Sequence, residues 1–177
     1  ANTMKSQLTD KIIENAVRKM PPSAFNLTGE EIINKLKSRR NNLDKTALQY
    51  YNTLAKEVTI SGSDKYEFAE INRTTDSTTI NLYKTKKVDN KLTKELNVYL
   101  LNESDSLVIQ GESATPIKIR VVGGKQKDYL ADQATNGRTL LFDTPENTFA
   151  DGSNTKLVRT TKDWVNEYLR DDFTYDK

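Results

Sequence analysis

The sequence contains neither cysteine nor histidine. Without cysteine there is no disulfide and no thiol nucleophile, and without both residues the usual zinc sites and imidazole acid–base catalysis are excluded. The chemistry that remains is that of carboxylates, Lys, Tyr, Ser and Thr. The lack of cysteine does not indicate a compartment, because reducing and oxidising locations both tolerate such a chain.

Long hydrophobic runs and a dominant charge are missing as well. No apolar stretch approaches the roughly 18–20 residues that cross a bilayer, and the first four residues lack the pattern of a signal peptide. Lys and Arg number 27 against 25 Asp and Glu, so the net charge gives no reason to expect nucleic acid as a partner. We expect a soluble chain without a transmembrane segment, forming one core or one core with a helical arm.

Residues 1–56 are predicted to form that helical arm. Apolar residues recur at three- and four-residue spacing from Leu8 to Met20, and the two prolines that follow are predicted to end this first helix. The motif Thr28-Gly29-Glu30-Glu31 matches a capping box. It predicts a second, long helix that reaches about residue 56 and is either continuous or broken at residues 39–42. The arm is therefore interpreted as a helical hairpin.

Residues 57–177 are predicted to be all β with a closing segment at the C-terminal end. The period changes to two after Glu57, and the first strands are expected to form an antiparallel meander, with the lysine-rich residues 84–94 as a solvated hairpin tip. Residues 96–109 are followed by a similar pattern at 117–130 and a third at 139–143, a repeat of about twenty residues. Such a repeat is typical of a short β-roll or solenoid, and it equally fits consecutive strands of a β-sandwich. The fold class is accordingly α+β.

The C-terminal end is rich in aromatic residues. A short capped helix or closing segment is expected at residues 161–169, anchored by the one tryptophan. The acids and aromatics at 171–175 make an unusual end for a compact domain, which suggests that the chain leads into a further segment. The candidates for contact with a partner are Trp164, Tyr168, Phe173 and Tyr175.

A glycine-rich turn gives the sharpest local motif. Residues 123–130 approach the nonapeptide with which parallel β-rolls hold calcium, so Asp128 and its counterpart Asp105 are weak calcium candidates. Gln126 replaces the third glycine, and two lysines add positive charge. A plain turn between strands is the favoured interpretation, and no metal or cofactor is expected.

Two other sets of residues receive non-catalytic interpretations. Asp128, Asp132 and Asp143 fall near strand ends, where paired carboxylates could converge for hydrolysis, but their spacing does not require it. The chain is therefore predicted not to be an enzyme, and no catalytic residue is assigned. The basic clusters are interpreted as a solvated helical face and as protection of a sheet edge; they are Lys35, Lys37, Arg39 and Arg40, and Lys84, Lys86 and Lys87.

A series of short motifs spans nearly the whole chain. They are Leu8-Thr9-Asp10, Met20-Pro21-Pro22, Gly29-Glu30-Glu31-Ile32, Leu36-Lys37-Ser38-Arg39-Arg40, Tyr50-Tyr51-Asn52-Thr53-Leu54-Ala55-Lys56-Glu57-Val58, Gly62-Ser63-Asp64-Lys65, Val98-Tyr99, Asp105, Ile119-Arg120-Val121-Val122-Gly123-Gly124-Lys125, Asp128, Phe142-Asp143-Thr144-Pro145 and Phe173-Thr174-Tyr175. In this order they resemble a region of large Bacteroidetes envelope proteins. In that family the region is similar to a linker between an N-terminal calcineurin-like metallophosphoesterase and a C-terminal outer-membrane β-barrel of surface-antigen type.

The resemblance implies a location and a role. The chain would lie in the periplasm or at the cell surface, and its partners would be neighbouring domains of the same polypeptide, among them the outer-membrane β-barrel. The histidines and the Asp/Asn motifs of the phosphoesterase have no counterpart here, so no catalytic residue is carried over. We therefore expect a non-catalytic accessory module that spaces or docks its neighbours. The alternative is an extracellular module that binds calcium, a glycan or a peptide.

Overall fold

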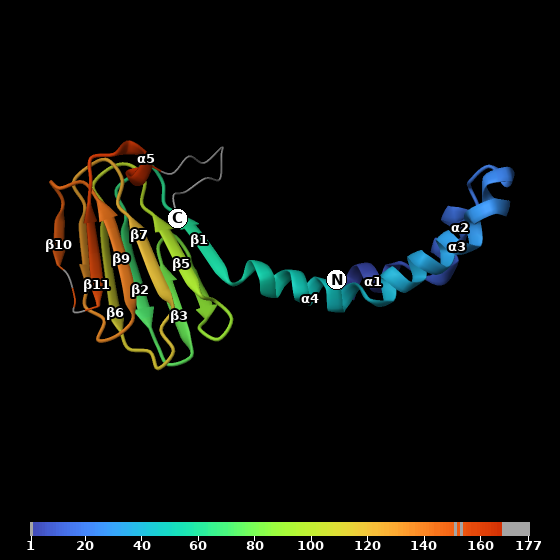
Figure 1. Cartoon of the computed structure of the whole chain (residues 1–177), viewed down its shortest axis with the longest axis horizontal. Coiled ribbons are helices and arrows are strands. Elements are labelled where there is room, and N and C mark those ends of the chain that lie inside the picture. Colours follow the sequence, from blue (N-terminus) through green and yellow to red (C-terminus); the bar gives the residue numbers. More distant parts are fainter. Residues whose placement is uncertain (1, 151, 153, 168–177) are drawn as a thin grey trace. The chain divides into compact units, whose positions relative to one another are not determined.

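The computed structural model describes residues 2–150, 152 and 154–167, and the chain divides into two compact units, Ala1–Leu54 and Ala55–Lys177. The first unit is helical and the second is rich in β-strands, as the sequence predicts at this coarse level (Figure 1). The predicted boundary, between residues 56 and 57, falls two residues after the observed division. Among the described residues, none of the helices is both long and apolar enough to cross a membrane.

The helical unit packs through a few apolar side chains. Its helices are α1 (Asn2–Gln7), α2 (Asp10–Val17), α3 (Pro22–Asn41) and α4 (Leu43–Leu54). Helix α2 begins where the Thr9 hydroxyl accepts a hydrogen bond from the Ile12 amide, the usual cap of a helix start. Ile13 and Val17 lie one turn apart on α2 and are buried, as is Ile33 on the adjoining α3. The α2–α3 pair thus has a small apolar seam.

The long helix differs from its prediction at both its start and its middle. Helix α3 begins at Pro22, because proline at the first helical position already has helical φ. The predicted capping box is therefore wrong: Thr28 lies inside α3, and its hydroxyl donates to the Ala24 carbonyl. A break separates α3 from α4 at Asn42, within residues 39–42, where the sequence analysis allowed for a break.

The β unit consists of two sheets. The first has the order β1-β5-β7-β9-β11 and the second β10-β8-β6-β2-β3-β4. The strands are β1 (Glu57–Ser61), β2 (Phe68–Arg73), β3 (Ser77–Asn81), β4 (Thr85–Asp89), β5 (Glu95–Tyr99), β6 (Ser106–Gly111), β7 (Lys118–Val122), β8 (Tyr129–Asp132), β9 (Arg138–Asp143), β10 (Thr148–Ala150) and β11 (Thr155–Arg159). A short helix, α5 (Asp163–Asn166), follows them.

Successive strands alternate between the sheets, apart from a β3–β4 hairpin inserted after β2. One strand in each sheet makes a coil, and each coil stacks on the previous one in parallel register, as when Leu96 pairs with Ile119 and Leu107 pairs with Leu130. Equivalent positions of two successive coils are 38 residues apart in the sequence where the coil contains the hairpin, and 23 residues apart in the next coil. This parallel stacking is the arrangement of a β-roll rather than that of a sandwich of antiparallel strands.

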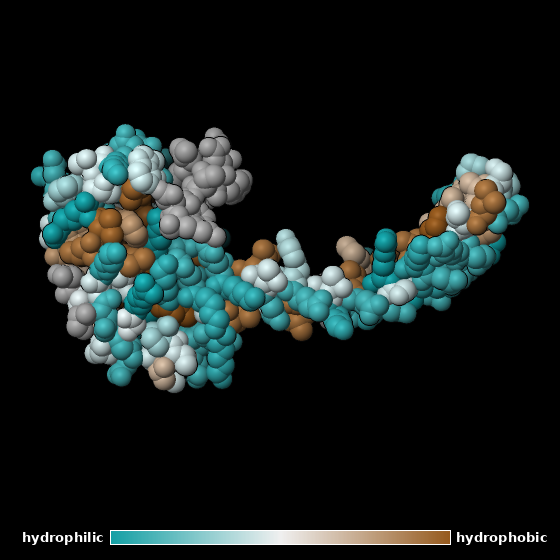
Figure 2. Space-filling model, viewed as in Figure 1, coloured by the Kyte–Doolittle hydropathy of each residue, from teal (hydrophilic) through white to brown (hydrophobic). Residues whose placement is uncertain are grey.

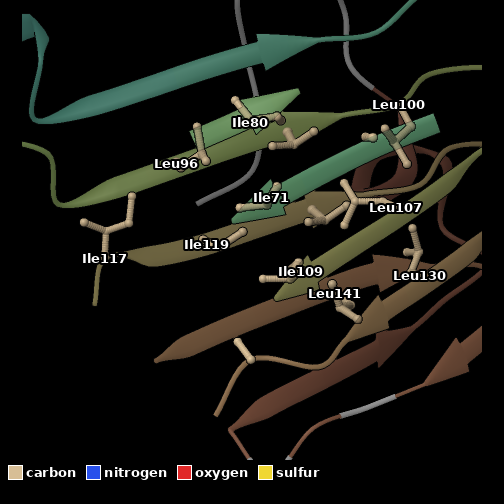
Figure 3. Packing of buried hydrophobic residues seen from close by; sticks show 14 of the residues in the cluster. Ile71, Ile80, Leu96, Leu100, Leu107, Ile109, Ile117, Ile119, Leu130 and Leu141 are labelled. Atoms are coloured by element: carbon tan, nitrogen blue, oxygen red, sulfur yellow. The ribbon is translucent and has the colours of Figure 1, made fainter. Parts of the chain in front are cut away.

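The core of the roll lies between its two sheets. Figure 3 shows Leu96, Ile119 and Leu141 from one sheet and Ile71, Ile109 and Leu130 from the other, all completely buried. These residues alternate along their strands with outward-facing ones, as strands require. The repeat in the sequence is thus the repeat of inward-facing positions.

Three predictions about the β unit are wrong. Strands β1 and β2 belong to different sheets, so the antiparallel meander is limited to β2, β3 and β4. The supposed hairpin tip at 84–94 contains strand β4, in which Val88 is buried. Lys86 and Lys87 beside it are exposed, so this one buried position is not detected in a search for apolar alternation. Trp164 does not anchor the closing segment, because its side chain is 61% exposed.

Candidate functional site

A column of buried acids lies along one edge of the roll, where the chain crosses from the first sheet to the second. Glu67, Asp105 and Asp128 each directly precede a strand of the second sheet, and the register places them on equivalent positions of successive coils. Asn147 occupies the same position in the next coil. Asp143, at the end of β9, adjoins them. We call Glu67, Asp105, Asp128 and Asp143 the carboxylate column.

Asp105 and Asp128 each tie their turn to the turn of the previous coil, whereas Glu67 and Asp143 bond within their own turns. The Glu67 amide donates to Asp105 Oδ1 at 2.8 Å, and the Asp105 amide donates to Asp128 Oδ1 at 2.7 Å. Glu67 Oε1 accepts from the Ser63 amide at 2.8 Å, and Asp143 Oδ1 accepts from the Thr144 amide at 2.7 Å. One oxygen of every carboxylate therefore satisfies a backbone donor that a tight turn leaves unpaired.

The second oxygens of Glu67 and Asp105 are buried without a hydrogen-bond partner, and those of Asp128 and Asp143 are buried next to each other. Two of these oxygens meet at Gly123, where a side-chain carbon would lie 2.0 Å from Asp143 Oδ2 and 2.6 Å from Asp128 Oδ2. Glycine is required here because any side chain would displace the acids. The missing side chain at Gly123 makes the close approach of Asp128 and Asp143 possible.

This environment favours the protonated acids. Burial raises the pKa of Asp105 to about 7, and the hydrogen bond from the Glu67 amide only partly opposes it. Burial likewise raises the pKa of Asp128 to about 8 and that of Asp143 to about 6. Two adjacent buried carboxylates cannot both ionise cheaply. Asp128 and Asp143 are therefore best described as a pair that shares a proton near neutral pH.

Of the three acids that the sequence analysis weighed as a hydrolytic group, only two lie close together in the fold. Asp128 and Asp143 meet, but Asp132 lies at the other end of β8, where it accepts from the Ala134 amide and the Thr155 hydroxyl. Asp143 is fully buried and Asp128 is only 3% exposed. A substrate cannot reach either oxygen in this state, so the arrangement supports cohesion between coils rather than hydrolysis.

The two calcium candidates, Asp105 and Asp128, lie on adjacent coils. The Oδ1 atom of each accepts a hydrogen bond from a backbone amide. Gln126, which stands in place of the third glycine of the motif, accepts a hydrogen bond from the Glu103 amide at 2.7 Å and so links its turn to the previous one. Within the part of the chain that the structure describes, no group of three or more acids is placed to hold a metal ion. Asp105 and Asp128 link adjacent turns through the hydrogen bonds that they accept.

A buried arginine lies at the opposite edge of the roll and was missed in the sequence. Arg73 is 2% exposed and donates to the Ile117 carbonyl at 2.8 Å and to the Thr139 hydroxyl at 3.2 Å. Burial lowers its pKa, and the charge of Asp132 opposes that effect. The signal was available, because Arg73 continues the inward-facing series of Ala69 and Ile71.

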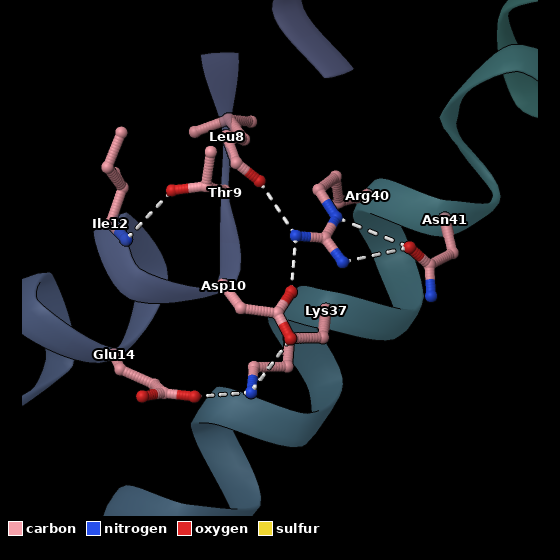
Figure 4. A network of polar contacts seen from close by, with 8 residues as sticks. All are labelled: Leu8, Thr9, Asp10, Ile12, Glu14, Lys37, Arg40 and Asn41. Atoms are coloured by element: carbon pink, nitrogen blue, oxygen red, sulfur yellow. Dashed lines mark hydrogen bonds and ion pairs between the residues drawn. The ribbon is translucent and has the colours of Figure 1, made fainter. Parts of the chain in front are cut away.

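The basic residues near position 40 hold the helical unit together (Figure 4). Arg40 donates to the Leu8 carbonyl at 2.8 Å and to Asp10 at 2.6 Å, and Lys37 pairs with Glu14 at 2.5 Å. These contacts engage both side chains within the unit. At the other basic cluster, Lys86 and Lys87 lie on β4, the edge strand of its sheet.

The aromatic candidates for partner contact are described only in part. Trp164 lies on α5, and the Lys162 ammonium is 5.1 Å from the centre of its ring. Tyr168, Phe173 and Tyr175 lie outside the described residues. Beside α5 the surface is hollowed into a pocket of about 470 Å³, between the turns that follow β7 and β9. Residues from three separate segments form this pocket, which no sequence motif indicated.

Comparison of the chain with models of protein families, with curated proteins and with solved structures finds no match. The resemblance to an envelope linker therefore remains a prediction.

Proposed function

We propose that the chain is a non-catalytic accessory module, located in the periplasm or at the cell surface, that spaces or docks neighbouring domains of an outer-membrane protein. The observation that carries this proposal is helix α4. Its 12 residues include no buried one, yet four large side chains are each more than half exposed: Leu48, Tyr50, Tyr51 and Leu54.

Three of these four exposed side chains lie on one side of the helix, and Tyr50 lies at the margin of that side. At about 100° per residue, Leu48, Tyr51 and Leu54 share a face with Ala47, whereas Lys45 and Gln49 lie on the opposite face. Hydrophobic atoms appear in brown along α4 in Figure 2. A helix with a continuous apolar face is typically covered by a partner. Along the chain, Ala55 and Lys56 alone separate α4 from β1.

The charged groups of the described residues support a mechanical role. The acids with raised pKa values are closed off from solvent, and Arg40 and Lys37 are engaged within the helical unit. Stacked coils form a stiff element whose length grows with the number of coils, which suits a spacer.

The proposal is tested by photo-crosslinking in cells that produce the whole gene product. A crosslinking amino acid replaces Tyr51 on the apolar face of α4 or, as a matched control, Lys45 on its polar face. We expect adducts at position 51, identified by mass spectrometry, within the same polypeptide or to an outer-membrane β-barrel, and far fewer at position 45.

Three results would contradict this function. They are equal adducts at the two positions, adducts at position 51 that join only two copies of the chain, and recovery of the protein outside the cell-envelope fraction. Turnover of a substrate that is lost when one acid is replaced by its amide would overturn the non-catalytic part of the proposal.

A further inference from the structure

The middle of the first sheet is buried on both of its faces. Strands β5 and β7 lie side by side there (Figure 1), and four of their residues face the core between the sheets: Leu96, Val98, Ile119 and Val121. Because side chains alternate along a strand, the residues next to these point outward: Asn97, Tyr99, Arg120 and Val122. We call these four residues the outer patch. All four are nonetheless buried, and none is more than 5% exposed.

Burial of outward-facing side chains is not general in this roll. On the outward face of the second sheet, Phe68 is 57% exposed and Tyr129 is 38% exposed. The second sheet cannot cover the outer patch, because it packs on the inward side of β5 and β7. Helix α5 packs at β9, and its Trp164 side chain is 61% exposed, so it is not buried against the sheet. The outer patch therefore has the character of an interface.

The surface around the outer patch combines apolar area with positive charge. The Arg120 guanidinium lies over the Phe142 ring of β9, with its carbon 4.6 Å from the ring centre. Four bases and two acids occupy outward positions of the first sheet: Lys118, Arg120, Arg138, Lys156, Glu57 and Glu95. The complementary occupant is a segment with aromatic and acidic side chains.

The chain arrives at the outer patch immediately after the closing segment. Tyr99 and Val122 are the last residues of two parallel strands and are paired in register, so they lie at the same end of the sheet. Lys125, three residues beyond Val122, forms an ion pair of 2.7 Å with Glu167. Residues 168–177 therefore start from that end of β5 and β7.

Residues 168–177 have the composition and the length that the outer patch requires. They include four large apolar side chains and three acids, against two bases: Tyr168, Leu169, Phe173, Tyr175, Asp171, Asp172, Asp176, Arg170 and Lys177. An extended chain of ten residues spans about 33 Å, whereas a strand of five residues spans about 17 Å. The segment is thus long enough to cross β5 and β7.

We propose that the outer patch binds residues 168–177 of the same chain. The apolar side chains of this segment cover Tyr99 and Val122, and the carboxylates of Asp171 and Asp172 lie beside Arg120. The inference is independent of helix α4 and of the function proposed for it.

The test measures how fast a single thiol at the outer patch reacts with N-ethylmaleimide. The chain has no cysteine, so Val122→Cys places the only thiol on the outward side of β7, and Val121→Cys places it on the core side as a matched control. In the full chain both thiols should react slowly. When the chain is shortened to residues 1–167, we expect labelling at position 122 to accelerate by about tenfold or more, and labelling at position 121 to stay slow.

Double variants of the full chain separate the contributions of charge and of apolar contact. Asp171→Asn with Asp172→Asn, and separately Phe173→Ser with Tyr175→Ser, should each accelerate labelling at position 122, whereas Asp76→Asn on the β2–β3 turn should not. If shortening the chain exposes positions 121 and 122 alike, the double variants decide. Unchanged labelling at position 122 in the shortened chain or in both double variants would overturn the proposal. Protection that disappears on dilution would also overturn it, because the covering segment would then belong to a second copy.

Discussion

Asp128 and Asp143 illustrate how single residues determine the conditions under which the roll is stable. Their pKa values, about 8 and about 6, lie above the ordinary value of 3.8, so the folded chain binds protons more tightly than the unfolded chain does. This contribution to stability is fully present below about pH 4. It is lost as the pH rises through the folded-state pKa values, because the two carboxyl groups then ionise while they are still buried.

Asp128→Asn is expected to remove part of this pH dependence. The amide oxygen still accepts from the Asp105 amide, and the new Nδ2 donor faces Asp143, which can then ionise without a like charge beside it. We expect a melting temperature close to that of the unmodified chain at pH 5 and higher at pH 8, by about 2–4 °C for each kcal/mol of repulsion removed. Asp64→Asn, an exposed turn residue, is the control. A lower melting temperature at pH 8 would contradict a protonated pair.

Gly123→Ala is expected to destabilise the roll at every pH. The added methyl group would overlap Asp143 Oδ2, and relief requires the two acids and their turns to move apart. Overpacking of this kind typically costs about 1–3 kcal/mol, which urea unfolding can measure. Ser104→Ala on the preceding turn should have little effect. An unchanged midpoint for Gly123→Ala would show that the acids are not held together.

At the scale of elements, the ion pairs of the helical unit are expected to determine how firmly α2 is held. Arg40→Ala removes the contacts with the Leu8 carbonyl and Asp10, which are two of the polar connections between α3 and the start of α2. We expect amide hydrogen exchange in α2 to accelerate by about tenfold, because hydrogen bonds to charged groups are among the stronger ones. Arg39→Ala, an exposed neighbour, should leave exchange unchanged, and similar acceleration in both variants would contradict this role.

The strands of the repeated region were predictable from sequence, whereas their partners were not. Apolar alternation fixed the positions of β5 to β9, but the same alternation fits parallel and antiparallel pairing. Strand β4 was missed because Lys86 and Lys87 outweigh the single inward-facing Val88 in any count of apolar positions. The meeting of Asp128 and Asp143 also depended on the pairing of β7 with β9, which only the three-dimensional register reveals.

At the scale of the whole molecule, the core explains why the β unit should be independent. Every residue of the hydrophobic cluster and its packed surroundings lies between Val58 and Leu157. The helical unit, in contrast, buries little beyond Ile13, Val17 and Ile33. Small helical segments with so little buried surface are marginal on their own.

A fragment of residues 55–177 is therefore expected to fold alone and to melt cooperatively, with the circular dichroism of a β protein. A fragment of residues 1–54 should show partial helicity that increases with trifluoroethanol. As a control, Leu107→Ala in the longer fragment should lower its stability by about 2–5 kcal/mol. Non-cooperative melting of the fragment of residues 55–177 would show that the two units depend on each other.

The β3–β4 hairpin adds residues to one coil without disturbing the register of its neighbours. Strand β2 still pairs with β6 from Phe68 to Arg73, although the chain makes an excursion before it returns at β5. A corner that already tolerates an added hairpin is a natural place to graft foreign peptide, since longer loops add only slowly to the entropy of closure. The turn between β6 and β7, which is the same corner one coil later, would therefore be the first choice for displaying an epitope or an affinity tag on this scaffold.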